Sequence, residues 1–252
     1  MNSRLLWEAG FERIFIQPAA SDAGNALGAA LWVWHQRLGH RRGPAMTHAF
    51  HGADWTEGEQ AAALAGQGLQ VRKVADPAEE AARLLADGRI VGWFQGRAEI
   101  GPRALGARSI LADPRQAETK DVVNARVKRR EGFRPFAPSV LDEDGADWFD
   151  GHHPNPFMLL VQSVRADRWD RIPAVTHVDG TARLQSVTAA EHPLYHRLIS
   201  RFAAHTGVPV VLNTSFNLRG EPIVHRPTEA VADFLASDMD ALFLGNLLAT
   251  KP

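Results

Sequence analysis

The 252-residue sequence contains no cysteine. This absence excludes a disulfide framework, a thiolate metal site and a cysteine nucleophile. No run of about 18 apolar residues occurs, so no segment is expected to span a bilayer. The N-terminal stretch MNSRLLWEAGFER lacks the apolar core and small-residue cleavage site of a secretory signal. The lack of cysteine does not fix the compartment, and we expect a cytoplasmic location because none of these observations opposes it.

The sequence also lacks a strong excess of either charge. Its formal net charge is −1, which argues against a protein whose whole surface binds nucleic acid. Apolar residues make up 45% of the chain and charged residues 23%, proportions that are typical of a globular protein. The length suits one large domain or two modest ones.

Residues 1–40 do not contain enough elements for a domain. A short strand is expected at 13–17, ended by Pro18, and a helix follows with Ser21 or Asp22 as its cap. The apolar positions of this helix form a stripe so wide that it needs a partner surface. We therefore expect residues 1–40 to be the C-terminal end of a larger domain, whose remainder is either missing or supplied by another chain.

The rest of the chain divides into a connecting segment and one main domain. Residues 41–75 are rich in His, Gly and Pro and are predicted to be a linker with a weak helix at 57–65. The main domain is expected at 76–252, where Asp76 and Pro77 start its first helix. Strands are expected at 89–94, 109–112, 136–141, 157–164, 183–188, 208–213 and 241–246, and helices at 77–87, 117–130, 193–205 and 227–236. This mixture predicts an α/β domain with a mixed, twisted sheet and flanking helices.

The segment 96–134 concentrates positive charge. It holds ten Lys or Arg residues and five acids, so it carries +5 in a chain of net charge −1. Its first part repeats glycine every five residues, at 96, 101 and 106, around Arg97, Arg103 and Arg108. Glycine permits close approach of the backbone to a ligand, and guanidinium groups bind phosphate or carboxylate oxygens in pairs. The pattern predicts a pocket for a phosphorylated small molecule. The alternative is a solvated basic face whose ion pairs contribute little.

Two later stretches carry polar side chains at the ends of predicted strands. Asn213, Ser215 and Asn217 follow an apolar run, where a strand often presents such groups to a ligand; the alternative is a polar turn closed on itself. Asp179 and Gly180 form a predicted turn that places Arg183 near a strand start, and an exposed hairpin is the simplest interpretation.

Metal-binding patterns are incomplete. His192 and His196 have the spacing of two ligands on one helix face, but Pro193 places His192 before the helix, so both are predicted to be ordinary surface histidines. Helix capping alone accounts for Asp22.

Four segments taken together give the sequence a resemblance to a known family. GRAEIGPRALGARSILADPR, VKRREGFRPFAP, HVDGTARLQSV and LNTSFNLRGEPIV resemble, in order and spacing, the C-terminal, YrdC-like part of the O-carbamoyltransferases of antibiotic and nodulation-factor biosynthesis. The stretch FERIFIQPAASDAGNALGAALWVWH resembles the end of that family's first domain, a Kae-type member of the actin-like ATPase superfold.

The resemblance implies a reaction and a set of residues. In such enzymes the YrdC-like domain is thought to combine carbamoyl phosphate with ATP into carbamoyl adenylate, and a first domain that holds a divalent metal such as iron passes the carbamoyl group to a hydroxyl acceptor. Lys128 and Arg103 are the implied catalytic residues. The implied anion and adenylate contacts are Arg103, Lys128, Arg134, Arg183 and Ser215, with Arg97, Arg108, Asn213 and Asn217 as neighbours. The family's aspartate metal ligand falls on Asp22.

The resemblance leaves alternatives open. The family's first domain supplies two histidine ligands upstream of the position of Asp22, and this chain starts too late to contain them. The chain is then a fragment, a subunit completed by a partner chain or a homo-oligomer, or a protein that retains only the adenylate half-reaction. Two other functions remain: a nucleic-acid-binding YrdC-like module, against which the absence of interleaved aromatic residues argues, and a non-catalytic partner subunit.

Overall fold

A mixed β-sheet forms the centre of the protein. The computed structural model describes residues 1–11 and 14–252, and in this part of the chain eight strands form one sheet in the order β1-β10-β9-β2-β3-β8-β4-β7. The pairs β2–β9 and β4–β7 are parallel and the other neighbours are antiparallel. The predicted mixed α/β architecture is confirmed.

The bounds of the described elements are as follows. The strands of the main sheet are β1 (Gln70–Lys73), β2 (Val91–Phe94), β3 (Arg108–Ala112), β4 (Ala137–Leu141), β7 (Gln185–Val187), β8 (Val210–Ser215), β9 (Ala241–Leu244) and β10 (Leu247–Thr250), and β5 (Gln162–Ser163) pairs with β6 (Thr181–Ala182) apart from it. The α-helices are α1 (Asn2–Glu8), α2 (Asp22–Trp32), α3 (Glu57–Leu64), α4 (Pro77–Ala86), α5 (Glu118–Val122), α6 (Gly145–Trp148), α7 (Pro193–Thr206) and α8 (Pro227–Ala236). Two π-helical turns, η1 (Val33–Arg37) and η2 (Val123–Lys128), continue α2 and α5, and three 3₁₀ turns are η3 (Asp142–Asp144), η4 (Ala166–Arg171) and η5 (Pro173–Val175).

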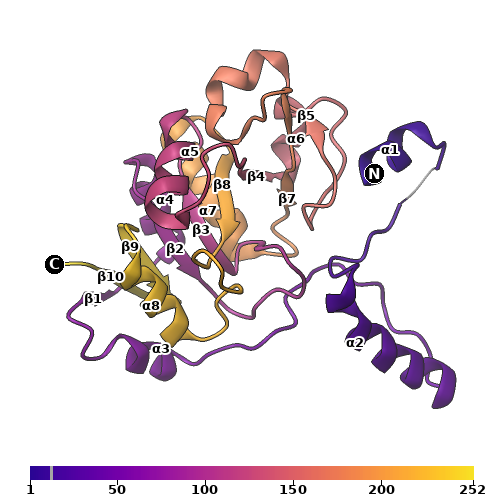
Figure 1. Ribbon diagram of the computed structural model, residues 1–252, viewed down its shortest axis with the longest axis horizontal. Coiled ribbons are helices and arrows are strands. Elements are labelled where there is room, and N and C mark those ends of the chain that lie inside the picture. Colours follow the sequence, from indigo (N-terminus) through magenta and orange to yellow (C-terminus); the bar gives the residue numbers. More distant parts are fainter. Residues whose placement is uncertain (12–13) are drawn as a thin grey trace.

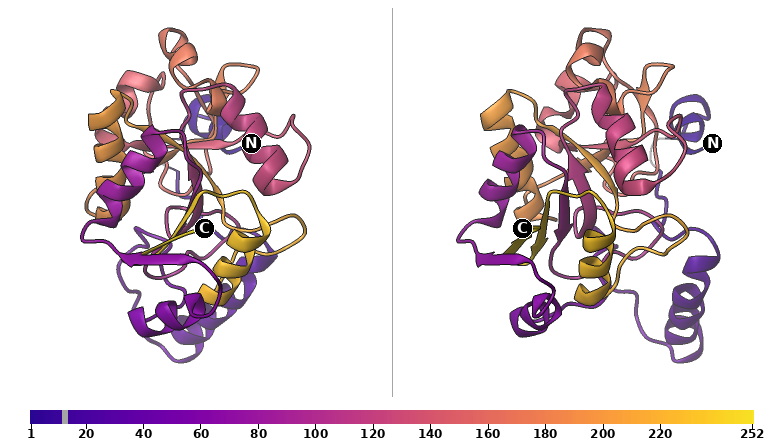
Figure 2. Two further views of the ribbon diagram at one scale, coloured as in Figure 1. Left: turned by 90° about the vertical axis from the view of Figure 1, so that its left-hand side faces the viewer. Right: turned by 60° about the vertical axis from the view of Figure 1, so that its left-hand side comes forward.

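Helices cover both faces of this sheet. Figure 2 shows α4 and α7 on one side of the strands and α5 and α8 on the other. The central strands β2 and β3 are buried along their whole length, as expected for strands covered on both faces. The side chains between sheet and helices form one continuous apolar core, and its burial is the main force that holds the layers together.

Local sequence signals explain where several helices begin. The Asp76 side chain accepts hydrogen bonds from the first turn of α4, with Pro77 as its first residue. Thr56 and Glu59 form a reciprocal capping box at the start of α3, which satisfies backbone N–H groups that have no partner within the helix. Both helices start where the sequence predicts them.

The N-terminal segment lies beside the main body. Figure 1 shows α1 and α2 to one side of the sheet and its helices, joined to them by extended chain. Helix α2 buries none of its residues, and the exposed apolar side chains of α2 and of η1, which continues it, include Leu31, Trp32 and Trp34. The predicted helix is confirmed, and the breadth of its apolar face is confirmed with it.

The predicted strand at 13–17 does not form in the described residues. Arg13 lies outside them, and residues 14–17 belong to no strand. A strand needs a neighbour to satisfy its backbone groups, and no described strand lies beside this segment.

Two other strand predictions differ from the structure in detail, and two strands were missed. The strand predicted at 157–164 is reduced to β5, and the one predicted at 183–188 is reduced to β7, with β6 just before the predicted start. Strands β1 and β10 were not predicted. Every residue of β1 is exposed, so β1 lacks the alternating pattern that identifies a strand in a sequence.

Candidate functional site

Lys128 joins two segments that are distant in sequence. It is the last residue of η2 and is only 5% exposed. Its Nζ donates to the main-chain oxygens of Ser215 at 2.9 Å and Asn217 at 2.7 Å, and to Oδ1 of Asn217 at 2.6 Å. Because β8 ends at Ser215, the ammonium group sits at the end of that strand. Two of the polar side chains predicted there, Ser215 and Asn217, therefore meet the predicted lysine.

The backbone just after Lys128 fixes its position. Arg129 adopts a left-handed conformation, φ 46°, which ends the helix. The Arg129 guanidinium donates to the main-chain oxygen of Ala236 at 2.6 Å, so the end of η2 is tied to the end of α8. Lys128 is thus held between the loop after β8 and helix α8.

A cavity of about 180 Å³ opens beside Lys128 and is lined mainly by cationic and polar groups. The predicted residues on its wall are Lys128, Arg134, Ser215 and Asn217; the others are Arg130, Glu131, Leu218, Arg219 and Gly220. Several positive charges around one small cavity favour a polyanionic ligand.

Two arginines of this cavity were not predicted as site residues. Arg130 lies two positions after Lys128, stacks over the Phe136 ring at 4.7 Å and donates to Oδ1 of Asn124 at 2.7 Å. Arg219 follows the strand-end cluster by two positions. Both belong to segments that the sequence singles out, but which arginines of a basic run face a cavity depends on the backbone path.

Burial changes the acid–base behaviour of Lys128. Desolvation, followed by the nearby charge of Arg130, lowers the Lys128 pKa to about 7. A bound anion at this position favours the charged ammonium and so raises that pKa again. Arg134, which also lines the cavity, is half exposed and pairs with Glu131 at 3.0 Å.

A second cavity, of about 470 Å³, shares Ser215 and Asn217 with the first. Its other lining residues are Ala98, Glu99, Gly101, Pro102, Arg108, Glu221, Pro222, Ile223, Val224 and His225. The two hollows therefore meet at the end of β8.

Glu99 organises the glycine–arginine loop that borders this second cavity. Its Oε1 accepts hydrogen bonds from the backbone N–H groups of Leu105 at 2.7 Å, Ala107 at 2.8 Å and Arg108 at 3.2 Å. Gly106 has φ 104°, and a side chain there would overlap the Tyr195 ring. Gly106 therefore lets the backbone of the loop approach a side chain of the protein's own core.

Two arginines of the loop are bonded to the protein's own backbone. Arg108 is fully buried, stacks over the Phe94 ring at 3.6 Å, and its Nη atoms donate to four main-chain oxygens, those of Ala53, Gln95, Gly96 and Ala107. Burial lowers its pKa to about 10, so it stays charged at neutral pH. Arg97 donates to the main-chain oxygens of His51 and Gly52. In this arrangement both hold the loop; an anion contact for either stays a prediction.

Arg103 and Arg183 lie close enough for their charges to repel. Burial and then the charge of Arg103 lower the Arg183 pKa to about 10. The Nε of Arg183 is buried, and the described residues provide no acceptor for it. Neither guanidinium forms an ion pair within residues 1–11 and 14–252. A pair of unneutralised guanidinium groups is a second place that favours an anion. Neither lines the cation-lined cavity beside Lys128.

Asn213 lies deeper, inside the sheet. Its Nδ2 is within hydrogen-bond distance of Ser139 Oγ and Gln185 Oε1 and of the main-chain oxygen of Ala104. It thus links β8 to the backbone next to Arg103. A direct contact of Asn213 with a ligand stays a prediction.

The described residues do not form a site for iron. No group of three His, Asp or Glu side chains among them is placed to hold a metal ion, and Asp22 is exposed at the start of α2. His196 pairs with Glu143 at 2.6 Å. His192 precedes the helix as predicted, but it is not an ordinary surface histidine: its Nε2 is buried, and desolvation lowers its pKa to about 4.

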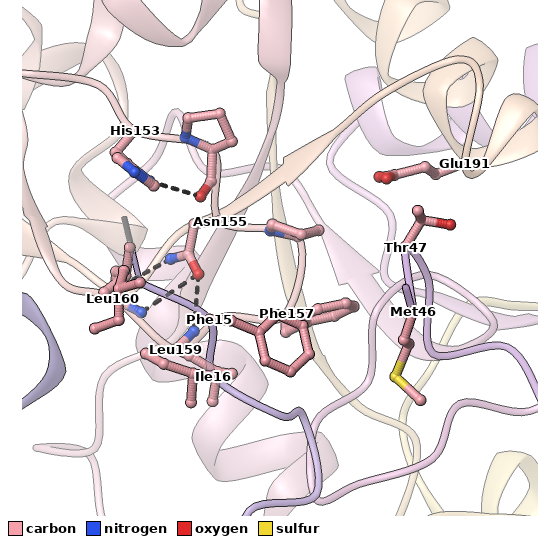
Figure 3. Close-up of a pocket in the computed structure, with 13 residues that line it drawn as sticks. Phe15, Ile16, Met46, Thr47, His153, Asn155, Phe157, Leu159, Leu160 and Glu191 are labelled. Carbon is pink, nitrogen blue, oxygen red and sulfur yellow. Dashed lines mark hydrogen bonds between the residues drawn. The ribbon is translucent and has the colours of Figure 1, made fainter. Parts of the chain in front are cut away.

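A third cavity, of about 240 Å³, lies between residues 14–16 and residues 153–160 (Figure 3). Its one amide, Asn155, uses both ends of its side chain on backbone groups: Nδ2 donates to the carbonyls of Leu160 and Leu184, and Oδ1 accepts from the N–H of Leu159. What remains on the wall is chiefly apolar, including Phe15 and Phe157. This cavity lacks the cationic lining of the site beside Lys128.

The fold and the site define an α/β domain with a cation-lined cavity at the end of β8. Residues 82–251 match the family Carbamoyltransferase C-terminus, and the chain belongs to that family.

Two relatives and one solved structure illustrate the similarity. The chain is 47% identical to the nodulation protein NolO of Bradyrhizobium diazoefficiens, over 100% of this chain and 47% of NolO. It is 39% identical to the 3'-hydroxymethylcephem-O-carbamoyltransferase of Amycolatopsis lactamdurans, over 88% of this chain and 41% of that protein. The crystal structure of T. kodakarensis HypF aligns over 72% of this chain and 22% of its own, with 18% identity and a TM-score of 0.49, a similarity too weak to indicate a function.

This chain spans less than half the length of both curated relatives. None of the helices that the structure describes has the length and apolarity needed to cross a membrane.

Proposed function

We propose that this chain binds ATP and carbamoyl phosphate and forms carbamoyl adenylate for transfer to a hydroxyl acceptor. The observation that carries the proposal is the pair of cavities that meet at Ser215 and Asn217, one of them lined by Lys128, Arg130, Arg134 and Arg219. Membership of a carbamoyltransferase family supports the reaction type.

The charge distribution supports a polyphosphate in the cavity beside Lys128. ATP and carbamoyl phosphate are both strongly anionic, and to bring them together requires fixed positive charge. Arginines supply charge that does not titrate near neutral pH. Lys128 changes its protonation more readily, because desolvation has already lowered its pKa to about 7. In this proposal Lys128 and the arginines neutralise the triphosphate.

We assign the second anion, carbamoyl phosphate, to Arg103 and Arg183. Their mutual repulsion and the unpaired Nε of Arg183 are relieved when an anion binds between them. Arg103 directly follows Pro102, which lines the second cavity. Ser215 and Asn217, shared by the two cavities, are suited to hold the planar carbamoyl group by hydrogen bonds.

The proposed reaction balances when one water molecule is included as a reactant. Water displaces the phosphate of carbamoyl phosphate and leaves carbamate, and a carbamate oxygen then attacks the α-phosphorus of ATP and releases pyrophosphate. The role of the protein is to orient two anions and to stabilise the charge that moves to the leaving phosphates.

The transfer step is assigned to groups beyond those that the described residues bring together. A metal at Asp22 requires further ligands, and the uncovered apolar face of α2 offers a docking surface for the domain, partner chain or second copy that supplies them. ATP as a substrate is consistent with a cytoplasmic location.

Calorimetry with each ligand tests the proposal. The wild type is expected to bind ATP and carbamoyl phosphate saturably, the Lys128→Ala variant to lose ATP binding, and the Arg103→Ala variant to lose carbamoyl phosphate binding. Incorporation of labelled pyrophosphate into ATP, dependent on carbamoyl phosphate, reports the adenylate step. A folded wild type that binds neither ligand would refute the proposal.

A further inference from the structure

Gln185 is a buried amide that the proposed reaction does not use. It is the first residue of β7 and is only 3% exposed. Its Nε2 donates to the main-chain oxygen of Leu105 at 2.8 Å, across 80 positions of the sequence. Leu105 is the second residue after Arg103. The side chain of Gln185 is therefore bonded to the backbone of the loop that carries Arg103.

Side chains from the two neighbouring strands bind the amide oxygen of Gln185. Ser139 lies directly opposite Gln185 on β4, and its Oγ donates to Oε1 of Gln185 at 2.8 Å. Nδ2 of Asn213, on β8, donates to the same oxygen at 3.1 Å. Ser139 and Asn213 are 0% and 1% exposed, so water does not compete for these bonds. Both ends of the amide are thus bonded to the protein, which fixes the orientation of the Gln185 side chain.

The backbone that follows Arg103 is bonded at three successive polar groups. The main-chain oxygen of Ala104 lies 3.2 Å from Nδ2 of Asn213. The N–H of Leu105 donates to Oε1 of Glu99 at 2.7 Å, and the oxygen of Leu105 has the amide bond described above. A peptide unit is planar, so partners on both its oxygen and its N–H fix the plane between Ala104 and Leu105. The chain just after Arg103 is therefore held in place.

Three polar side chains, those of Ser139, Gln185 and Asn213, occupy core positions that apolar side chains could fill. Burial of an amide or a hydroxyl group has a desolvation cost that its hydrogen bonds only partly offset. The described residues also provide no partner for Oδ1 of Asn213, so this network is not the most stable filling of the space. Apolar side chains could not donate hydrogen bonds to the loop backbone. The network therefore serves the position of the loop more than the stability of the core.

Gln185 is also close in the chain to the second arginine that we assign to carbamoyl phosphate. Arg183 precedes Gln185 by two positions, and its buried Nε has no acceptor among the described residues. The guanidinium groups of Arg103 and Arg183 repel each other, so they stay together only where the backbone holds them. Gln185 belongs to the strand that follows Arg183, and it is bonded to the loop that follows Arg103. It thus connects the segments that carry the two arginines.

We propose that Gln185 is a positioning residue for carbamoyl phosphate: its amide holds the backbone after Arg103 at a fixed place relative to Arg183, so that both guanidinium groups face one anion. This inference rests on the proposed function, because carbamoyl phosphate is the anion assigned to this pair. Gln185 acts through Arg103 and does not touch the ligand. The cavity beside Lys128 is lined neither by Gln185 nor by any residue bonded to it, so binding of the nucleotide there is independent of Gln185.

The test compares Gln185→Met with Ser186→Ala. Methionine has a similar volume but no donor for Leu105, so Gln185→Met should bind carbamoyl phosphate about tenfold more weakly and ATP like the wild type. Ser186 is the next residue of β7, is also 3% exposed, and its Oγ accepts from the N–H of Asn155 at 2.7 Å. Ser186→Ala therefore removes a buried hydrogen bond that does not involve the loop, and it should keep both affinities. Calorimetry with each ligand measures them.

A milder variant provides the same test if Gln185→Met does not fold. Ser139→Ala leaves the bond from Gln185 to Leu105 in place but removes one of the two bonds that orient the amide. Carbamoyl phosphate should then bind about threefold more weakly, while ATP binding is retained. An unchanged affinity for carbamoyl phosphate in the folded variants of Gln185 and Ser139 would overturn the role of Gln185, and so would an equal loss in Ser186→Ala.

A second measurement does not need a ligand. Amide hydrogen exchange reports local opening of the backbone. Relative to the amides of β2, those of residues 104–107 should exchange about tenfold faster in Gln185→Met than in the wild type, and at the wild-type rate in Ser186→Ala. A wild type that binds no carbamoyl phosphate but shows this difference would refute only the proposed function. Equal exchange of residues 104–107 in the wild type and Gln185→Met would show that Gln185 does not hold the loop.

Discussion

Lys128 and Asn217 lie 89 positions apart, and Nζ of Lys128 donates both to the main-chain oxygen of Asn217, at 2.7 Å, and to its Oδ1, at 2.6 Å. This ammonium group joins η2 to the loop after β8. Because these bonds are made to a segment that lines both cavities, Lys128 shapes the site and also supplies a positive charge to it.

Lys128→Met should therefore lower stability and abolish ATP binding together. The acceptors on Ser215 and Asn217 lose their buried donor, which costs about 1–3 kcal/mol of unfolding free energy. Arg126→Met, on the exposed side of the same helical segment, is the control. Urea denaturation and calorimetry measure the two effects, and ATP binding that survives in the methionine variant would contradict the prediction.

The pH dependence of stability should also report on Lys128. Its pKa is about 7 in the folded protein and 10.5 in the reference state, so between these values the unfolded chain binds the extra proton. Stability then rises with pH from about 7 to 10, by at most about 1.4 kcal/mol per unit. Lys128→Met should lack this rise. Denaturant titration at each pH measures this rise in both proteins. An identical rise in the wild type and Lys128→Met would show that Lys128 is not its source.

Arg108→Met should destabilise the protein far more than Arg97→Met. The buried guanidinium of Arg108 donates hydrogen bonds to four main-chain oxygens and stacks on Phe94. Its removal leaves those oxygens without a hydrogen-bond donor. A loss of about 3–5 kcal/mol is expected. Arg97 is exposed, so Arg97→Met should lower the free energy of unfolding by less than about 1 kcal/mol. Thermal denaturation of both variants measures the two losses of stability, and equal losses would contradict the prediction.

Arg183→Met should separate ligand binding from stability. Arg183→Met removes the contacts of the Arg183 side chain, but it also removes a partly desolvated charge that is repelled by Arg103. Because these two effects oppose each other, the melting temperature should stay within a few degrees of the wild type. Carbamoyl phosphate binding should fall by tenfold or more (about 1.4 kcal/mol), while ATP binding is retained. A large fall in melting temperature would instead mark Arg183 as a structural arginine like Arg108.

Gly106→Ala and Gly88→Ala form a matched pair. Both glycines have positive φ angles, but only Gly106 faces a neighbour, the Tyr195 ring, where a side chain would overlap. Gly88→Ala should cost about 1 kcal/mol through backbone strain alone, and Gly106→Ala about 3 kcal/mol or more. Chemical denaturation tests this difference.

The sequence predicted well those features whose signals are local. Asp76 with Pro77 starts α4, and Asp179 with Gly180 makes the turn that leads into β6. The clustering of Lys128, Arg134, Ser215 and Asn217 followed from the resemblance and is consistent with the geometry, since all four line one cavity. Their contacts with ligands stay predictions.

Only the tertiary structure decided which charged residues of these segments face a cavity. Arg97, Arg103 and Arg108 accompany the same regularly spaced glycines, yet their positions differ. Arg108 is buried beneath the loop, Arg97 binds the backbone of residues 51–52, and Arg103 lies close to Arg183. Burial and carbonyl partners depend on chain segments tens of residues away, which no local pattern encodes. The amino-acid order by itself determined the helix starts, the alternation of elements and the excess of positive charge in one segment; long-range packing determined how that charge is used.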